Sequence, residues 1–206
     1  MAPKTPLLDP HTYFDAYRDP FIAGMAVWLA HVIGWMIAIF AILRLFISRI
    51  EGLPPGAGRE VYREFVPMVF LFAILAVLAL LVVAGIMHTL SRYAGGTGSF
   101  GDALAVAGWS YAPDLIELPI TYLAAWWQMR DMRLDASEPQ QFLPEVEAAI
   151  EPTGGLMILT SLGVVVWSVY ILAKGTAATH ELPVGKTIWP ALLIGFGAFV
   201  FRASGV

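Results

Sequence analysis

The sequence contains no cysteine among its 206 residues, which excludes disulfide bonds and thiolate metal sites. Charged side chains are also scarce. They make up 14% of the chain, against about a quarter in a typical soluble domain. The 12 Lys and Arg residues are scattered and form no basic stripe, so nucleic acid is not an expected partner. Hydrophobic residues, in contrast, account for 58% of the chain, and most lie in long runs.

Five apolar runs approach or exceed the length needed to cross the hydrocarbon of a bilayer, which takes about 20 residues of helix. We therefore expect an all-α, polytopic membrane helical bundle with about five transmembrane helices, a multi-pass protein of the cell membrane. The first run is too long for the apolar part of a cleavable signal peptide and is expected to remain as a span. The predicted spans are Phe21–Ile47, Phe65–Met87, Ala103–Trp127, Gly154–Leu172 and Thr187–Phe201.

The connections predict a single domain, 1–206, with two parts outside the bundle. The leader, 1–20, predicts either a short amphipathic helix lying on the membrane, with Leu8, Tyr13, Phe14 and Tyr17 on its apolar face, or an irregular segment. The acidic stretch 128–152 predicts an extramembrane loop. Lys and Arg residues in the connections favour an external N-terminus only slightly, so the side of the N-terminus stays open.

The third apolar run is unusual, because a proline and two carboxylates interrupt it. Pro113 is expected to kink or break the helix. Asp114 and Glu117 are three residues apart and so share one helix face. Inside a membrane, ionised carboxylates are costly and mark a pathway, a partner or a protonated state. One hypothesis is therefore a proton- or cation-responsive site in an interrupted helix, as in transporters, with His31 or His88 nearby.

Two alternatives without transport remain for these carboxylates. In one, the third run dips only shallowly, and both side chains meet water or lipid headgroups. In the other, Arg92 or Arg44 pairs with one carboxylate and the contact is purely structural.

No cofactor, metal site or catalytic residue is predicted. Haem commonly takes an axial histidine, but no paired-histidine spacing on a single helix supports haem here. Ser110 follows Gly108-Trp109, yet no second glycine completes a G-x-S-x-G nucleophile elbow. The sequence also lacks an HExxH zinc motif and a phosphate-binding P-loop. We therefore expect a non-enzymatic protein.

The segment Gly95–Pro119, GGTGSFGDALAVAGWSYAPDLIELP, resembles the core of the Yip family of Ypt/Rab-interacting membrane proteins. In that family a glycine turn leads into a membrane segment that carries an aromatic residue and a proline. Gly108, Tyr111 and Pro113 occupy those places. The DLYGP element of eukaryotic members is absent as such, which puts Rab binding in doubt.

Two further segments carry the same likeness. Pro10–Pro20 resembles the short helix before the membrane in prokaryotic members, and Trp167–Trp189 resembles the connection between the last two spans. The resemblance implies a five-span fold and a role in membrane organisation, in trafficking or as a scaffold of a membrane complex. The alternative function is a small transporter or channel subunit with an intramembrane carboxylate site. Expected partners are the lipid bilayer and other membrane proteins or a second copy, since Ala30, Gly34 and Ala38 allow helices to approach closely.

Overall fold

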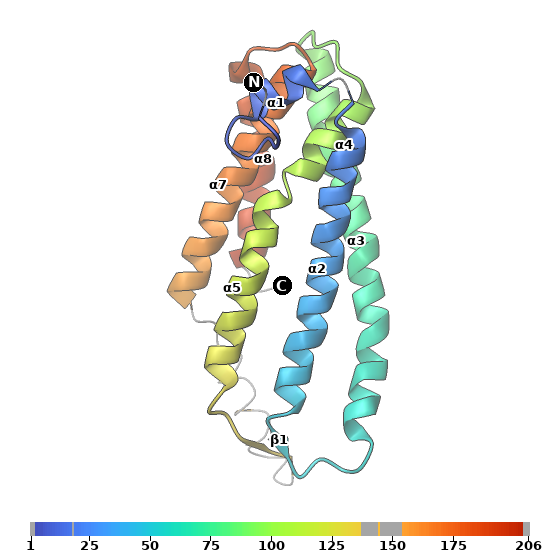
Figure 1. The fold of residues 1–206 in the computed structure, drawn as a ribbon, viewed down its shortest axis with the longest axis vertical. Helices are drawn as coiled ribbons and strands as arrows, with labels where there is room; N and C mark the ends of the chain where they lie inside the picture. Colours follow the sequence, from blue (N-terminus) through green and yellow to red (C-terminus); the bar gives the residue numbers. More distant parts are fainter. Residues whose placement is uncertain (1–2, 18, 137–143, 145–153, 204–206) are drawn as a thin grey trace.

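The computed structural model describes residues 3–17, 19–136, 144 and 154–203. In this part of the chain nearly all regular structure is helical, and the predicted all-α bundle is confirmed (Figure 1). In chain order the elements are α1 (Pro10–Ala16), α2 (Phe21–Ile47), β1 (Ile50–Glu51), α3 (Ala57–Tyr93), α4 (Phe100–Trp109), α5 (Ala112–Met129), β2 (Leu134–Asp135), α7 (Gly154–Thr179) and α8 (Val184–Ala203).

Four of the described helices are long and apolar enough to cross a membrane: α2, α3, α7 and α8. Many of their large apolar side chains are exposed. On α3, for example, Phe70 is 62% exposed and Leu75 is 53% exposed. A surface of this kind is stable only when lipid or another apolar partner replaces water. The exposed faces of these helices are therefore membrane-facing.

The predicted third span is divided into two helices rather than one continuous helix. The short helix α4 ends at Trp109, and α5 begins at Ala112, so the break falls at Ser110 and Tyr111, immediately before the predicted Pro113. Pro113 lies in the first turn of α5, where the absent N–H has no helical acceptor to lose. Together α4 and α5 cover the third predicted span, Ala103–Trp127.

Glycine residues bring α4 and α2 into backbone contact. A Cβ atom at Gly108 would collide with the carbonyl oxygen of Gly24, and a Cβ at Gly24 would collide with the carbonyl of Ala105. A third glycine, Gly34, lies against the side chain of Leu118 on α5 in the same way. Gly34 is one of the small residues for which we expected close helix approach on α2. Its contact lies within this chain.

The leader differs from the predicted helix lying on the membrane, because its aromatic face packs into the protein. Tyr13 and Phe14 of α1 are each only 4% exposed. The ring of Tyr13 lies 5.6 Å from the ring of Trp109 in an edge-on arrangement. The indole N–H of Trp167 on α7 donates to the carbonyl of Leu7, 2.8 Å away. These contacts hold α1 against α7 and α4 (Figure 1).

A two-residue parallel bridge joins the two connections at the opposite end of the bundle. Ile50 pairs with Leu134, and Glu51 pairs with Asp135. Leu134 is 2% exposed, so its side chain anchors the bridge in the protein. Of the predicted acidic loop 128–152, the structure describes only 128–136 and 144, and the remainder lies outside the described residues.

Candidate functional site

The two carboxylates predicted on one helix face both meet a single arginine from the last helix. Asp114 and Glu117, on the first turns of α5, are 3% and 4% exposed. Atom Nη2 of Arg202 on α8 lies 2.8 Å from Asp114 Oδ1 and forms an ion pair with it. Arg202 Nη1 donates to Glu117 Oε2 at 2.6 Å. Both carboxylates are thus buried inside the protein, and their arginine partner is neither Arg44 nor Arg92.

Side chains from two more helices complete this group. Ser161 on α7 donates its hydroxyl proton to Glu117 Oε1 at 2.9 Å. His31 on α2 places Nδ1 3.5 Å from Asp114 Oδ2, as the sequence predicted for one of the two candidate histidines. We call Asp114, Glu117, Arg202, His31 and Ser161 the carboxylate cluster. It joins α2, α5, α7 and α8, four elements that are distant in the sequence.

Tyr111 lies beside the cluster at the break between α4 and α5. Its ring centre is 4.8 Å from that of His31, with the two planes tilted by 41°. His31 therefore contacts both Tyr111 and Asp114. The break therefore positions one aromatic residue and one carboxylate, three residues apart, against the same histidine.

Charge counting shows that the cluster is not neutral when both carboxylates are ionised and His31 is neutral. Two carboxylates then face one guanidinium, leaving one net negative charge in a largely water-excluded place. Such a charge is strongly disfavoured in a low-dielectric interior. One proton shared within the cluster, or one bound cation, restores neutrality.

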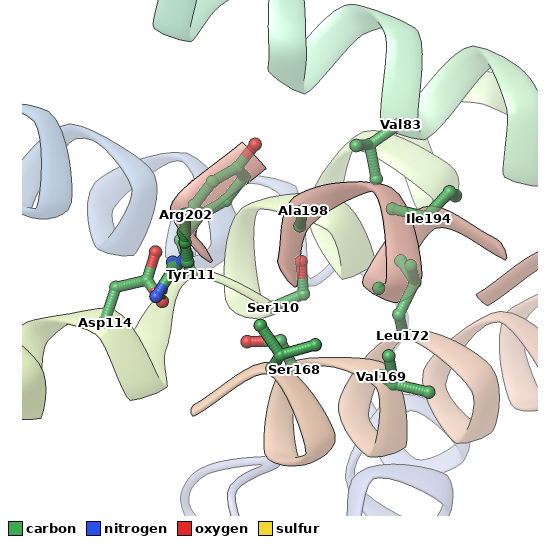
Figure 2. A pocket seen from close by; sticks show the side chains of 12 residues that line it. Val83, Ser110, Tyr111, Asp114, Ser168, Val169, Leu172, Ile194, Ala198 and Arg202 are labelled. Atoms are coloured by element: carbon green, nitrogen blue, oxygen red, sulfur yellow. Dashed lines mark ion pairs between the residues drawn. The ribbon is translucent and has the colours of Figure 1, made fainter. Parts of the chain in front are cut away.

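A small cavity of about 90 Å³ opens next to Asp114 and Arg202. Each enclosed water needs about 10–15 Å³ by this measure, so several fit. Figure 2 shows Asp114 and Arg202 meeting at one side of the cavity, while Leu172 and Ile194 line the apolar side. The hydroxyl-bearing Ser168 also lines it. The cavity lies among α3, α5, α7 and α8, with the ionic pair at its polar end.

The other two predicted site residues, His88 and Arg92, lie at the end of α3 in a separate group. His88 Nδ1 is 3.3 Å from Nε2 of His180, which follows α7 and is fully buried. Arg92 Nη1 donates to the carbonyl of Gly96 at 3.0 Å. The loop between α3 and α4, which contains Gly95, Gly96 and Gly98, packs over this pair, since a Cβ at Gly98 would collide with the ring of His180. His88 is therefore not part of the carboxylate cluster.

Three residues carried the predicted family motif, and each has a physical role in this geometry. Gly108 allows the backbone contact between α4 and α2. Tyr111 stacks on His31. Pro113 is fully buried in the first turn of α5, next to Asp114. The motif thus shapes the helix break that presents the carboxylates. Among the described residues, no three His, Asp or Glu side chains converge as a metal site.

Sequence reasoning missed Arg202 and did not connect Ser161 to the carboxylates. Arg202 follows the predicted fifth span by one residue and so read as a residue of the membrane surface. Ser161 lies on an apolar helix, and nothing in the sequence identifies its hydrogen-bond partner. The weak signal for Arg202 was its position as the last charged residue of an apolar helix.

Long apolar helices, membrane-facing surfaces and an ionic cluster inside the bundle define a helical integral membrane protein. The family model of the Yip1 domain matches residues 6–203. The chain therefore belongs to the Yip1 domain family, as the resemblance predicted. Comparisons with curated proteins and with solved structures find no match.

Proposed function

We propose that this Yip1-domain protein is a non-enzymatic component of the cell membrane that organises the membrane, or a membrane complex, through helix packing. The observation that carries the proposal is the closure of the carboxylate cluster by the chain's own side chains. Arg202 contacts both carboxylates, and Ser161 occupies a second oxygen of Glu117. Groups engaged in this way hold helices together and are not presented to a substrate.

The cluster supports a structural role because its members come from four helices and connect those helices to one another. Glycine contacts hold α4 against α2, but α8 packs chiefly on α7. Arg202 adds a polar connection from the end of α8 to α5. Buried ionic networks are weak sources of stability, yet in some proteins they specify one packing arrangement among several apolar alternatives. A defined arrangement is what a membrane scaffold requires.

Reconstituted vesicles test the proposal with two readouts. The variant Asp114→Asn/Glu117→Gln removes the carboxylate charges, and Glu60→Gln, an exposed carboxylate on α3, is the matched control. We expect vesicles with the wild-type protein to pass protons and monovalent cations no faster than empty vesicles. Cryo-electron microscopy should show vesicle size or apposition changing with protein density.

The control should behave as the wild type in both assays. The double variant should lose thermal stability without altering cation flux. Vesicles that stay unchanged at every protein density would contradict the organising role.

A second function, a small transporter or channel subunit, is favoured by the one uncompensated charge and by the adjacent cavity. A proton or small cation could bind at Asp114 to neutralise the cluster. Under this function, wild-type vesicles show a saturable flux that the folded double variant abolishes and the Glu60→Gln control retains. That result would replace the first proposal by the second.

A further inference from the structure

The β1–β2 bridge joins the two connections at the end of the bundle where Figure 1 labels β1. A pocket of about 390 Å³ lies beside this bridge. This size falls within the range of small-molecule sites, about 300–1,000 Å³. Its lining is mostly polar and comes from the segments that follow α2 and α5. Three arginines contribute, and we call the site the arginine pocket after them: Arg49, Arg130 and Arg133.

The level of the pocket in the membrane follows from the tryptophans at the end of α5. Trp126 and Trp127 are 42% and 61% exposed. Exposed tryptophans at the end of a membrane helix are typical of the headgroup region, where the ring meets both apolar and polar surroundings. Arg130 lies over the ring of Trp127, 3.6 Å from its centre. The arginine pocket therefore opens at headgroup depth.

The pocket carries unused capacity to bind an anion. Arg130 Nε pairs with Asp131 Oδ2 at 3.0 Å. Arg49 Nε, in contrast, is buried and has no hydrogen-bond partner within the described residues. Arg133 makes no ion pair with any residue that the structure describes. A buried guanidinium donor without a partner is costly unless a ligand completes it.

The net charge of the pocket matches one phosphodiester. Its three arginines face two carboxylates, Glu51 and Asp131, so one positive charge remains. Guanidinium groups bind phosphate through paired N–H donors of fixed geometry. Basic groups at the membrane surface also attract anionic lipids. A phosphodiester with no ammonium group beside it supplies the single negative charge that the pocket lacks.

We propose that the arginine pocket binds the phosphate of an anionic membrane lipid, with Arg49 and Arg133 as the residues that hold it. The parallel bridge fixes Arg49, because the amide of Leu134 donates to the Arg49 carbonyl at 3.0 Å. The same bridge places Arg133 beside it, one residue before Leu134. The site is remote from the carboxylate cluster, since it lies at the far ends of α2 and α5.

The test uses the full chain in non-ionic detergent and counts bound lipids by native mass spectrometry. The probes are phosphatidylglycerol, phosphatidylcholine and inorganic phosphate. The pocket variant is Arg49→Gln/Arg133→Gln. The control, Arg59→Gln/Arg63→Gln, removes two exposed positive charges from the start of α3, outside the pocket.

We expect the wild type and the control to bind phosphatidylglycerol in preference to phosphatidylcholine. The pocket variant should bind it roughly tenfold more weakly, since each lost charge-assisted hydrogen bond removes a large part of the attraction. Arg133→Gln alone, at an exposed position, should show a smaller loss and serves if the double variant does not fold.

Three results would overturn the proposal. Equal losses in the pocket variant and the control would show general charge attraction without a site. Equal binding of phosphatidylcholine would remove the requirement for net negative charge. Displacement of phosphatidylglycerol by inorganic phosphate at comparable concentration would identify a free-anion site in place of a lipid site.

Discussion

Replacing Arg202 by methionine should destabilise the protein more than any exposed charge change. The substitution keeps an unbranched side chain of similar reach but removes the cation that faces Asp114 and Glu117. Both carboxylates are then left at 3% and 4% exposure with only Ser161 and His31 as partners. Removing one member of a buried ionic group costs about 3–5 kcal/mol. The arginine side chain is 27% exposed, so we expect the lower end, about 3 kcal/mol.

The loss should come mainly from the stranded carboxylates and not from the missing contact itself. Adding Asp114→Asn and Glu117→Gln to Arg202→Met should therefore recover at least about half of the lost stability. The free energy of unfolding can be followed by tryptophan fluorescence while SDS is titrated into mixed micelles.

The matched control for this series is Arg63→Met. Arg63 pairs with Glu60 at 2.6 Å, but both side chains are mostly exposed, and such pairs contribute about 0–1 kcal/mol. An Arg202→Met protein that loses no more stability than this control would refute the account of the cluster. So would a triple variant that is less stable than Arg202→Met alone.

Three further changes test other contacts. Gly108→Ala should lower the free energy of unfolding by about 1–3 kcal/mol, because the added Cβ would meet the carbonyl of Gly24. The control is Gly163→Ala, which has open space around it and should be neutral or stabilising by up to about 1 kcal/mol. Burial, aided by the neighbouring imidazole, holds the pKa of His180 below its usual 6.5. The unfolded chain therefore takes up a proton first as pH falls through 6.5, so stability drops there by at most about 1.4 kcal/mol per pH unit, and His180→Gln should flatten this part of the profile. Phe14→Ala should cost about 3–5 kcal/mol and expose the segment before α2 to limited proteolysis.

Each of these outcomes has a clear opposite. Equal effects of the two glycine substitutions would mean that α4 and α2 do not touch at their backbones. A stability profile that rises on acidification from pH 7 to pH 5 would contradict a neutral, buried His180. For α1 the control is Tyr17→Ala, since Tyr17 is 43% exposed. Proteolysis as fast in Tyr17→Ala as in Phe14→Ala would show that α1 is not held by its buried face.

The helices could be predicted from the sequence because the constraint that forms them is local. In hydrocarbon the backbone must satisfy its own hydrogen bonds, so a long apolar run becomes a helix whatever it packs against. The span Phe21–Ile47 was predicted with the bounds that the structure has. Proline has an equally local effect, and the break before Pro113 follows from it.

The partners of the carboxylates could not be predicted in the same way, because they depend on which helices become neighbours. The three-residue spacing of Asp114 and Glu117 placed them on one face, but nothing local selects Arg202 from the other arginines. His31 and His88 looked alike as residues of apolar helices. The packing of α2 against α5 places His31 beside Asp114. The turn after α7 places His180 beside His88.

The β1–β2 bridge was missed for a related reason. Two residues are too few to give an alternating pattern, and the strands lie more than eighty positions apart in the chain. The aromatic face of α1 was read correctly as apolar but assigned to lipid. The open positions on α7 that accept it, such as Gly175, become visible only in the assembled bundle.

The bridge also limits how the protein can rearrange. Because Ile50 pairs with Leu134 and Glu51 pairs with Asp135, the C-terminal ends of α2 and α5 cannot separate unless this bridge breaks. A shape change that leaves the bridge intact can separate α2 and α5 only at their other ends. At that end of α5, Arg202 of α8 contacts Asp114 and Glu117. Any such movement of α5 relative to α8 would have to break these ion pairs.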